Sequence, residues 1–269
     1  MIRGYAWLMC WIACLGCHSL SPPEDGPDAA ESLWRQGQEA MALGEPDKAI
    51  ACYQSSLALD GERTRNHLSL AAAHLECGRE AEACTHLGHY LDSQPGQVAM
   101  RGKYAELLWR LGKMAAAHTQ FTRFVTDVQE VNMPDVRMLV HAHGRLLELA
   151  EEDNDEYAVH LHRGLGLYFL ACGRAELPDP DGEFSTEGLL CKSAAELVLA
   201  HEAQPEEARP CWYLYEIWHK LAQVQTAGGW LRKAEAASRF SQLTPTEERR
   251  LLLALRAKAL VAPGNPRYD

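Results

Sequence analysis

The chain has 269 residues and a formal net charge of −11 at pH 7, which argues against a nucleic-acid-binding protein, because phosphate contacts need a basic surface. Its content of 47% hydrophobic and 23% charged residues is that of a globular protein and excludes a disordered chain. Nine cysteines are too few for a disulfide-dense miniprotein, and only five residues are Phe, which favours helices that pack closely on small side chains.

Residues 1–20 have the pattern of a secretory signal sequence. Arg3 is the only charged residue before Glu24, and it precedes an uncharged, mostly apolar run over residues 4–16. As a helix this run would rise about 20 Å, which is less than the roughly 30 Å hydrocarbon core of a membrane. The run therefore fits the apolar region of a signal peptide better than a membrane span, and the Pro-rich residues that follow it fit a tether.

A lipidation motif lies at the end of the apolar run. In Cys14-Leu15-Gly16-Cys17 a Gly directly precedes a Cys. This arrangement resembles the lipobox of bacterial lipoproteins, although that family usually has Leu where this chain has Cys14. The resemblance implies that residues 1–16 are removed as a signal peptide, that Cys17 carries the lipid anchor, and that residues 17–29 form its tether. We therefore expect an exported protein that is anchored to a bacterial envelope membrane and faces the periplasm.

An alternative motif uses the same residues. The sequence Cys14-Leu15-Gly16-Cys17-His18 matches C-x-x-C-H, the attachment pattern of c-type haem. The alternative is then a c-type cytochrome with a helical body. However, the motif overlaps the apolar run, a Pro-rich segment follows it in place of a haem-burying helix, and cleavage before Cys17 would remove Cys14. We therefore favour the lipid anchor and expect no cofactor.

A period of 34 residues starts at Ala30 and gives the blocks 30–63, 64–97 and 98–131. Three columns each hold one kind of residue: Gly at the fifteenth position (Gly44, Gly78, Gly112), Ala at the twentieth (Ala49, Ala83, Ala117), and an aromatic residue or Leu at the twenty-fourth (Tyr53, Leu87, Phe121). Gly takes the left-handed backbone that ends a helix, Ala lets two antiparallel helices approach, and the larger residue fills the groove between them. Each block therefore predicts a helix–turn–helix unit that must stack on its neighbours.

These columns resemble the tetratricopeptide repeat (TPR). The resemblance covers residues 30–131 and implies three regular units in an all-α fold, a right-handed solenoid of antiparallel helix pairs. The blocks depart from the family at the fourth position, where the family favours Trp and this chain has Leu33, His67 and Arg101. The resemblance also implies that the protein binds another protein or a peptide, in a role such as the assembly of envelope machines.

Residues 132–261 continue the array less regularly, as degenerate repeats. A first helix is predicted to end at Gly173 and its partner to span residues 187–204, with an inserted loop at 174–188 between them. A loop of that length inside a repeat array is a candidate functional segment.

A last helix pair is predicted over residues 210–243, with Gly228-Gly229 as the break between its two helices. Thr244 begins a capping sequence for a terminal helix that is expected to be solubilising and to run to about Val261. Residues 262–269 are expected to form a loose tail.

The chain carries no recognisable catalytic or metal-binding motif. It has no G-x-S-x-G and no Gly-rich phosphate loop, and the grouping of Cys84, His86 and His89 could bind a metal only with ligands from elsewhere. We predict no metal, no small-molecule substrate and no enzymatic activity. The alternative is a TPR-containing envelope enzyme or assembly factor that uses the 174–188 loop.

Six cysteines lie in the predicted mature domain, where we expect most of them to be packed as free thiols. Cys77 and Cys84, on either side of a predicted turn, are the one candidate disulfide pair.

The predicted binding surface is the concave face. The family's ligand-contacting positions correspond here to Glu31, Trp34, Gln38, Met41 and Ala42, to Arg65, Leu68, Ala72, Leu75 and Glu76, and to Ala99, Gly102, Glu106, Trp109 and Arg110. The residues that we select as partner-binding are Trp34, Gln38, Met41, Leu68, Glu106, Trp109 and Arg110. The four apolar side chains would form a strip that Glu106 and Arg110 border. The alternative is that Trp34 and Trp109 pack against adjacent helices as core residues. The sequence thus predicts a non-catalytic scaffold that holds a peptide or a partner helix on this face.

Overall fold

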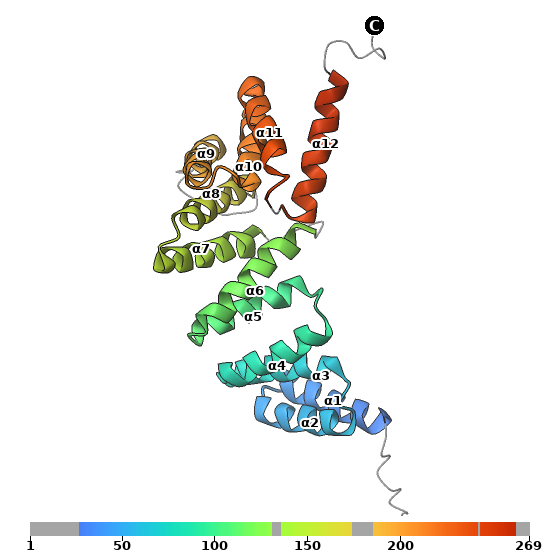
Figure 1. Ribbon diagram of the computed structural model, residues 1–269. Helices are drawn as coiled ribbons and strands as arrows, with labels where there is room; N and C mark the ends of the chain where they lie inside the picture. The colour runs from blue at the N-terminus through green and yellow to red at the C-terminus, as the bar shows by residue number, and fades with distance from the viewer. Residues whose placement is uncertain (1–26, 131–135, 174–184, 242, 262–269) are drawn as a thin grey trace, which may run out of the picture. The chain divides into compact units, whose positions relative to one another are not determined.

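The computed structural model describes residues 27–130, 136–173, 185–241 and 243–261, and in these residues the protein has twelve α-helices, one short 3-10 helix and no strand (Figure 1). The helices are α1 (Pro27–Ala42), α2 (Pro46–Leu59), α3 (Thr64–Glu76), α4 (Glu80–Ser93), α5 (Val98–Arg110), α6 (Met114–Asp127), η1 (Val128–Glu130), α7 (Val136–Asp153), α8 (Glu156–Cys172), α9 (Thr186–Ala203), α10 (Ala208–Lys220), α11 (Val224–Ala237) and α12 (Pro245–Val261). The predicted all-α, TPR-like solenoid class is confirmed.

Several predictions concern residues outside these ranges. The leader, Cys17, the C-x-x-C-H motif, residues 174–184 of the predicted loop and the tail all lie outside the described residues. None of the helices within the described ranges is long and apolar enough to cross a membrane.

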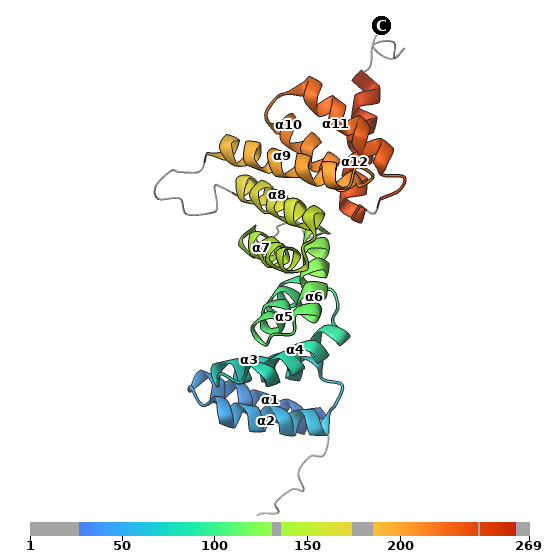
Figure 2. The same cartoon turned by 60° about the vertical axis from the view of Figure 1, so that its left-hand side comes forward.

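The chain divides into two compact units, residues 1–77 and residues 78–269. In the first unit α1 packs on α2, and α2 packs on α3. In the second unit each helix from α4 to α12 packs on the next one in the chain, and Figure 2 shows α8 and α9 lying side by side. This packing of neighbour on neighbour is what a repeat array requires, because a single helix pair cannot bury its apolar face alone.

The repeat columns pack as the sequence predicts. The alanines of the twentieth position are fully buried, and so is Tyr53. Gly37, at the eighth position of the first block, lies directly under the Tyr53 ring, so that an added Cβ would be 2.6 Å from Tyr53 Cδ1. Such a distance is far below van der Waals contact, and Tyr53 therefore requires a glycine opposite it.

The turn glycines of the three regular blocks have the left-handed backbone that ends a helix. Their φ angles are +72° at Gly44, +69° at Gly78 and +71° at Gly112. Two later turns have the same backbone without glycine, because φ is +56° at both Asn154, between α7 and α8, and Ala222, between α10 and α11. The degenerate half of the chain thus keeps the turn geometry after it has lost the turn residue.

One prediction about glycine is confirmed and one is wrong. The helix that was predicted to end at Gly173 does so, because α8 ends at Cys172 and Gly173, with a φ of −91°, is its C-cap. A Cβ at Gly173 would lie 2.8 Å from Val136 Cβ, so this position requires a glycine. Gly228-Gly229 does not separate two helices, because α11 runs through both residues. The break occurs instead at Ala222, and the buried residues Ala227 and Leu231 hold α11 against the rest of its unit.

The fourth position of the third block holds a buried cation in place of the family's Trp. Arg101 is 3% exposed; its Nη1 donates to Gln120 Oε1 at 3.0 Å, and its Nη2 donates to the Pro95 carbonyl. Its Nε lies 3.1 Å from the Asp127 carboxylate. The side chain therefore ties α5 to α6 by polar contacts where an indole would do so by packing.

Side chains cap the last helices. Ser185 Oγ accepts from the Gly188 N–H at 3.0 Å, so α9 begins at Thr186 and the predicted 174–188 loop is shorter at its C-terminal end. Thr244 and Glu247 form a reciprocal capping box at α12, with distances of 3.1 and 2.8 Å, as expected. α12, which is expected to be solubilising, exposes charged residues such as Glu248 and Arg256 and also two leucines.

The cysteines that were candidates for a disulfide are both free. Cys77 and Cys84 belong to the six free thiols of the described residues, and Cys84 is buried, which raises the pKa of its thiol. The sulfur of Cys77 lies 3.9 Å from an oxygen of Asp47.

Candidate functional site: the face of α1 and α3

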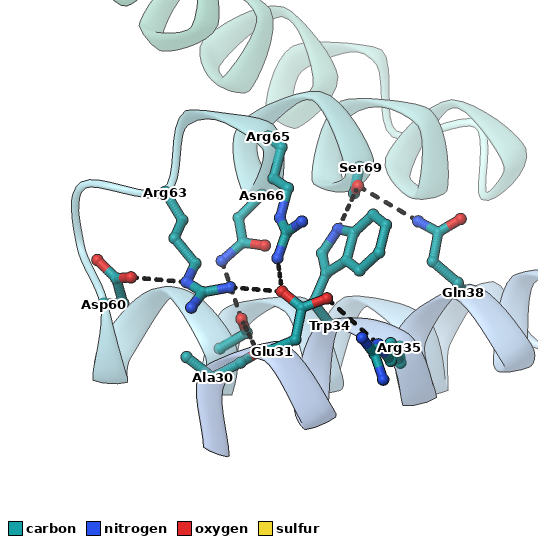
Figure 3. A network of polar contacts seen from close by, with 11 residues as sticks. Ala30, Glu31, Trp34, Arg35, Gln38, Asp60, Arg63, Arg65, Asn66 and Ser69 are labelled. Atoms are coloured by element: carbon teal, nitrogen blue, oxygen red, sulfur yellow. Dashed lines mark hydrogen bonds and ion pairs between the residues drawn. The ribbon is translucent and has the colours of Figure 1, made fainter. Parts of the chain in front are cut away.

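The candidate site is built from side chains of α1 that point toward α3 (Figure 3). Glu31, Trp34 and Gln38 share one face of α1, because they are three and four residues apart. Each of them contacts a residue of α3 or of the turn before it. We call this surface, made by Glu31, Trp34, Arg35, Gln38, Arg63, Arg65 and Ser69, the α1–α3 face.

Glu31 is surrounded by three guanidinium groups. Its carboxylate accepts from Arg63 Nη1 at 2.8 Å, from Arg35 Nε at 3.3 Å, and from Arg65. Arg63 also donates to Asp60 at 2.6 Å (Figure 3). The cluster holds three cations and two carboxylates, so its own net charge is positive.

Trp34 is held in one orientation by two contacts. Its Nε1 donates to Ser69 Oγ at 3.1 Å, and the Arg65 guanidinium lies 4.2 Å from the centre of the ring. The side chain is only partly buried and packs at the edge of the hydrophobic core of the first unit. Trp34 therefore packs partly as a core residue, and its role in partner binding stays a prediction.

Gln38 joins the surface to the buried Tyr53. Its Nε2 donates to the Tyr53 hydroxyl at 2.7 Å and lies 3.4 Å from Ser69 Oγ. Burial raises the pKa of Tyr53, so its phenol stays neutral. Met41 packs against the same core, and Leu68 is partly buried.

A buried polar chain lies beneath the face. Ser56 Oγ donates to the Ala30 carbonyl at 2.6 Å and accepts from Asn66 Nδ2 at 3.0 Å. These two bonds connect α2 to both α1 and α3. The polar groups of the face therefore rest on a base that fixes the spacing of the helices that carry them.

The predicted residues of the third block lie in the second unit. Glu106 accepts from Arg145 Nη2 at 2.9 Å and contacts His141 Nε2 at 2.8 Å. Burial raises the pKa of Glu106, but the hydrogen bonds from these two residues outweigh it, so the net pKa lies below the ordinary value. The Arg145 guanidinium also covers Trp109, 4.7 Å from the ring centre. Arg110 is exposed and pairs with Glu80.

The structure thus brings the selected residues together in two sets. Trp34 and Gln38 meet at Ser69, while Glu106 and Trp109 meet at Arg145. Sequence reasoning missed the residues that receive these contacts. One signal was available: Glu31 and Arg65 have opposite charges at the same position of successive blocks, which places them opposite each other on stacked first helices. Nothing comparable marked Arg145, because α7 lies outside the regular period.

Comparison with known proteins agrees with the repeat assignment in the first block. Residues 30–63 match the family model of the tetratricopeptide repeat, with the bounds of the first 34-residue block. No curated protein matches the chain.

The solved structures to which the chain is similar, all at low identity, include the following three proteins. YrrB, a TPR protein with an unusual peptide-binding site, is 17% identical, with a TM-score of 0.34 over 86% of this chain and 92% of that chain. The TPR2AB domain of yeast Sti1 in complex with pHSP90 is 15% identical, with a TM-score of 0.36 over 87% and 99%. BtubC from P. vanneervenii is 14% identical, with a TM-score of 0.40 over 90% and 85%.

Proposed function

Because residues 30–63 match a tetratricopeptide repeat and the helices pack in sequence order, we propose that this protein is a protein-interaction scaffold. Repeat folds of this kind present extended surfaces that bind partners by shape. We place the binding site on the α1–α3 face and propose that it holds a peptide or a helix of a partner protein.

The orientation of Trp34 is the observation that carries this proposal. A partly exposed indole, fixed by Ser69 and covered by Arg65, is the kind of rigid aromatic anchor that dominates binding energy in protein interfaces. Side-chain entropy that has already been lost in the free protein is not lost again on binding. The excess positive charge around Glu31 suits a partner segment with a carboxylate next to an apolar side chain.

Site-specific photocrosslinking tests the site. A photoreactive amino acid at Arg35, whose side chain is largely exposed, should crosslink to a partner in cells, whereas the same probe at Gln54, exposed on α2, should not. Adding Trp34→Ala to the Arg35 probe should lower the crosslinked fraction by about tenfold while circular dichroism shows unchanged helicity. Equal crosslinking from both positions, or a loss of helicity that accounts for the effect of Trp34→Ala, would contradict the proposed site.

We also propose that the scaffold is exported and held at a bacterial envelope membrane by a lipid on Cys17. The support is the sequence pattern alone, a short apolar run that ends in Gly16-Cys17. Cys17→Ser should move the protein from the membrane fraction to the soluble fraction, and Cys14→Ser should leave it anchored. Haem absorbance that is lost in both variants would instead favour the cytochrome alternative.

A further inference from the structure

The end of the second unit carries an apolar surface that is exposed to solvent. Phe240, just after α11, is 83% exposed, and Leu252 and Leu253 of α12 are 49% and 57% exposed. Single exposed apolar side chains are common, but a group of them at one end of a domain marks an interaction surface.

A hollow of about 510 Å³ lies on α11, and one of about 490 Å³ lies between α11 and α12. The second is lined by four leucines, Leu243, Leu251, Leu252 and Leu255, and by polar and charged residues that include Glu235 and Glu248. Its rim includes Arg239 and Ser241, the chain neighbours of Phe240. An exposed aromatic side chain thus lies next in sequence to residues that line a hollow. A surface that is complementary to itself needs both a protruding group and a hollow.

The charges on α12 favour the same arrangement. Glu248 and Arg256 are both exposed, and each is four residues from Leu252 on the same side of the helix. Within the described residues neither of them forms an ion pair. If two copies of α12 cross in opposite directions at Leu252, Glu248 of each copy faces Arg256 of the other, about 6 Å along the helix on either side of the crossing point.

One side of α12 is not available for such a contact, because Glu247 is buried against Arg209 at 3.1 Å and Arg250 pairs with Glu216 at 2.6 Å. Glu248, Leu252 and Arg256 are exposed. The exposed leucines begin directly after these anchored residues. A partner can therefore cover Leu252 and Leu253 without displacing α12.

We propose that the partner on this surface is a second copy of the chain, in a twofold-symmetric dimer whose α12 helices pack antiparallel at Leu252. In this arrangement Glu248 pairs with Arg256 twice, and Phe240 of each copy enters the hollow between α11 and α12 of the other. The interface closes on itself, so the assembly stops at two copies.

Sedimentation equilibrium of the full chain in density-matched detergent tests the dimer. The unmodified protein should have twice the monomer mass at micromolar concentration, and Phe240→Ser should raise the dissociation constant about tenfold or more. Because Phe240 is almost fully exposed, this substitution does not disturb the fold. Leu43→Ser, which removes an exposed leucine in the first unit, is the matched control and should leave the dimer intact. A monomeric unmodified protein would overturn the proposal and leave the hollow to another occupant, such as residues 262–269.

Charge reversal tests the antiparallel register. Glu248→Arg places like charges across the twofold axis and should weaken the dimer, and Arg256→Glu should do the same. A mixture of the two single variants restores both pairs in a mixed dimer, so fluorescence energy transfer between differently labelled copies should exceed that of either variant with itself. Weak pairing in the mixture, or single variants that dimerise as tightly as the unmodified chain, would overturn the register.

Discussion

Glycines in this chain occur in at least three different physical settings, and only one of these settings requires the left-handed backbone of glycine. Gly44 needs a left-handed backbone, Gly37 must leave room for Tyr53, and Gly228 lies inside a helix where an added Cβ would meet nothing within 4 Å. A sequence pattern does not separate these cases, because it gives neither the backbone φ angle of a glycine nor the side chains that lie next to it. The setting of Gly228 is the unexpected one, since a glycine inside a helix lowers the stability of that helix by about 1 kcal/mol relative to alanine.

Gly37 and Gly228 make a matched pair for substitution by alanine. Gly37→Ala should lower the free energy of unfolding by about 1–3 kcal/mol, because the new Cβ overlaps the Tyr53 ring. Gly228→Ala should raise it by up to about 1 kcal/mol, because the helix gains propensity at no steric cost. Urea denaturation of both variants measures the two changes. If Gly228→Ala were destabilising, α11 would not be a continuous helix in solution.

At the scale of the helices, the contact between α7 and α8 contains two imidazoles that cannot both be charged. The Nδ1 atoms of His143 and His162 lie 3.2 Å apart, and the His143 ring is stacked on Phe169 with 5.4 Å between centroids. At that distance one ring must donate and the other accept. Protonation of both would place two donors against each other in a buried site.

The surroundings of this pair also disfavour protonation. Burial lowers the pKa of His143 well below its ordinary value, and the neighbouring His162 and Arg209 lower it further. Burial lowers the pKa of His162 to about 4; Arg209 and His118 act in the same direction, and Asp155 acts against it. Arg209 itself is held at this place by the buried Glu247.

We therefore predict that acid weakens the fold through this pair. The unfolded chain keeps the ordinary histidine pKa of about 6.5 and so binds more protons than the folded chain between pH 6.5 and about 4. The stabilisation is complete above pH 6.5 and decreases by about 1–3 kcal/mol as the pH falls through this window. Urea denaturation at pH 7, 6 and 5 measures it. His162→Leu should flatten this dependence while His219→Gln, at an exposed position, should not; an equally steep dependence in His162→Leu would assign it to other groups.

The helices also show how far the sequence could be interpreted. The regular blocks were predictable because Gly44, Ala49 and Tyr53 recur with the same period, and each has a steric role that the structure confirms. The break at Gly228-Gly229 was not predictable, because glycine only weakens a helix, whereas packing of Leu231 and its neighbours holds α11 together. The sequence did not indicate the turn at Ala222, since alanine rarely has a positive φ and is not a typical turn residue.

For the candidate site, the sequence could supply positions but not contacts. Trp34 and Gln38 were identified by their place in the repeat. That Ser69 would receive hydrogen bonds from both depends on side-chain orientation across two helices. Arg63 lies in a turn outside the family's ligand-contacting positions, so only the folded chain shows that it shares Glu31 with Arg65.

At the scale of the whole molecule, the division into residues 1–77 and 78–269 has a consequence for cooperativity. In a repeat array, stability is approximately a sum of local terms and contacts between neighbours, so damage to one unit need not spread through the whole chain. Each unit has its own buried cluster, with Tyr53 and Leu70 in the first and Trp212 and Tyr213 in the second.

We predict that the first unit can be destabilised separately. Leu70 is fully buried in its core, and Leu70→Ala should cost about 2–5 kcal/mol through lost burial and the cavity left behind. Hydrogen exchange followed by mass spectrometry should show faster exchange in α1–α3, with amides of α8–α10 nearly unchanged. An equal increase in both regions would mean that the described chain unfolds as one cooperative body.

The left-handed backbone at Ala222 also has an evolutionary consequence. Alanine is less stable than glycine in this conformation by about 1 kcal/mol, and the codons of the two amino acids differ by a single nucleotide. The last hairpin is therefore one point mutation away from a more stable turn. A lineage under heat stress, or a laboratory selection for thermal tolerance, should recover Ala222→Gly early, before any substitution in the packed core.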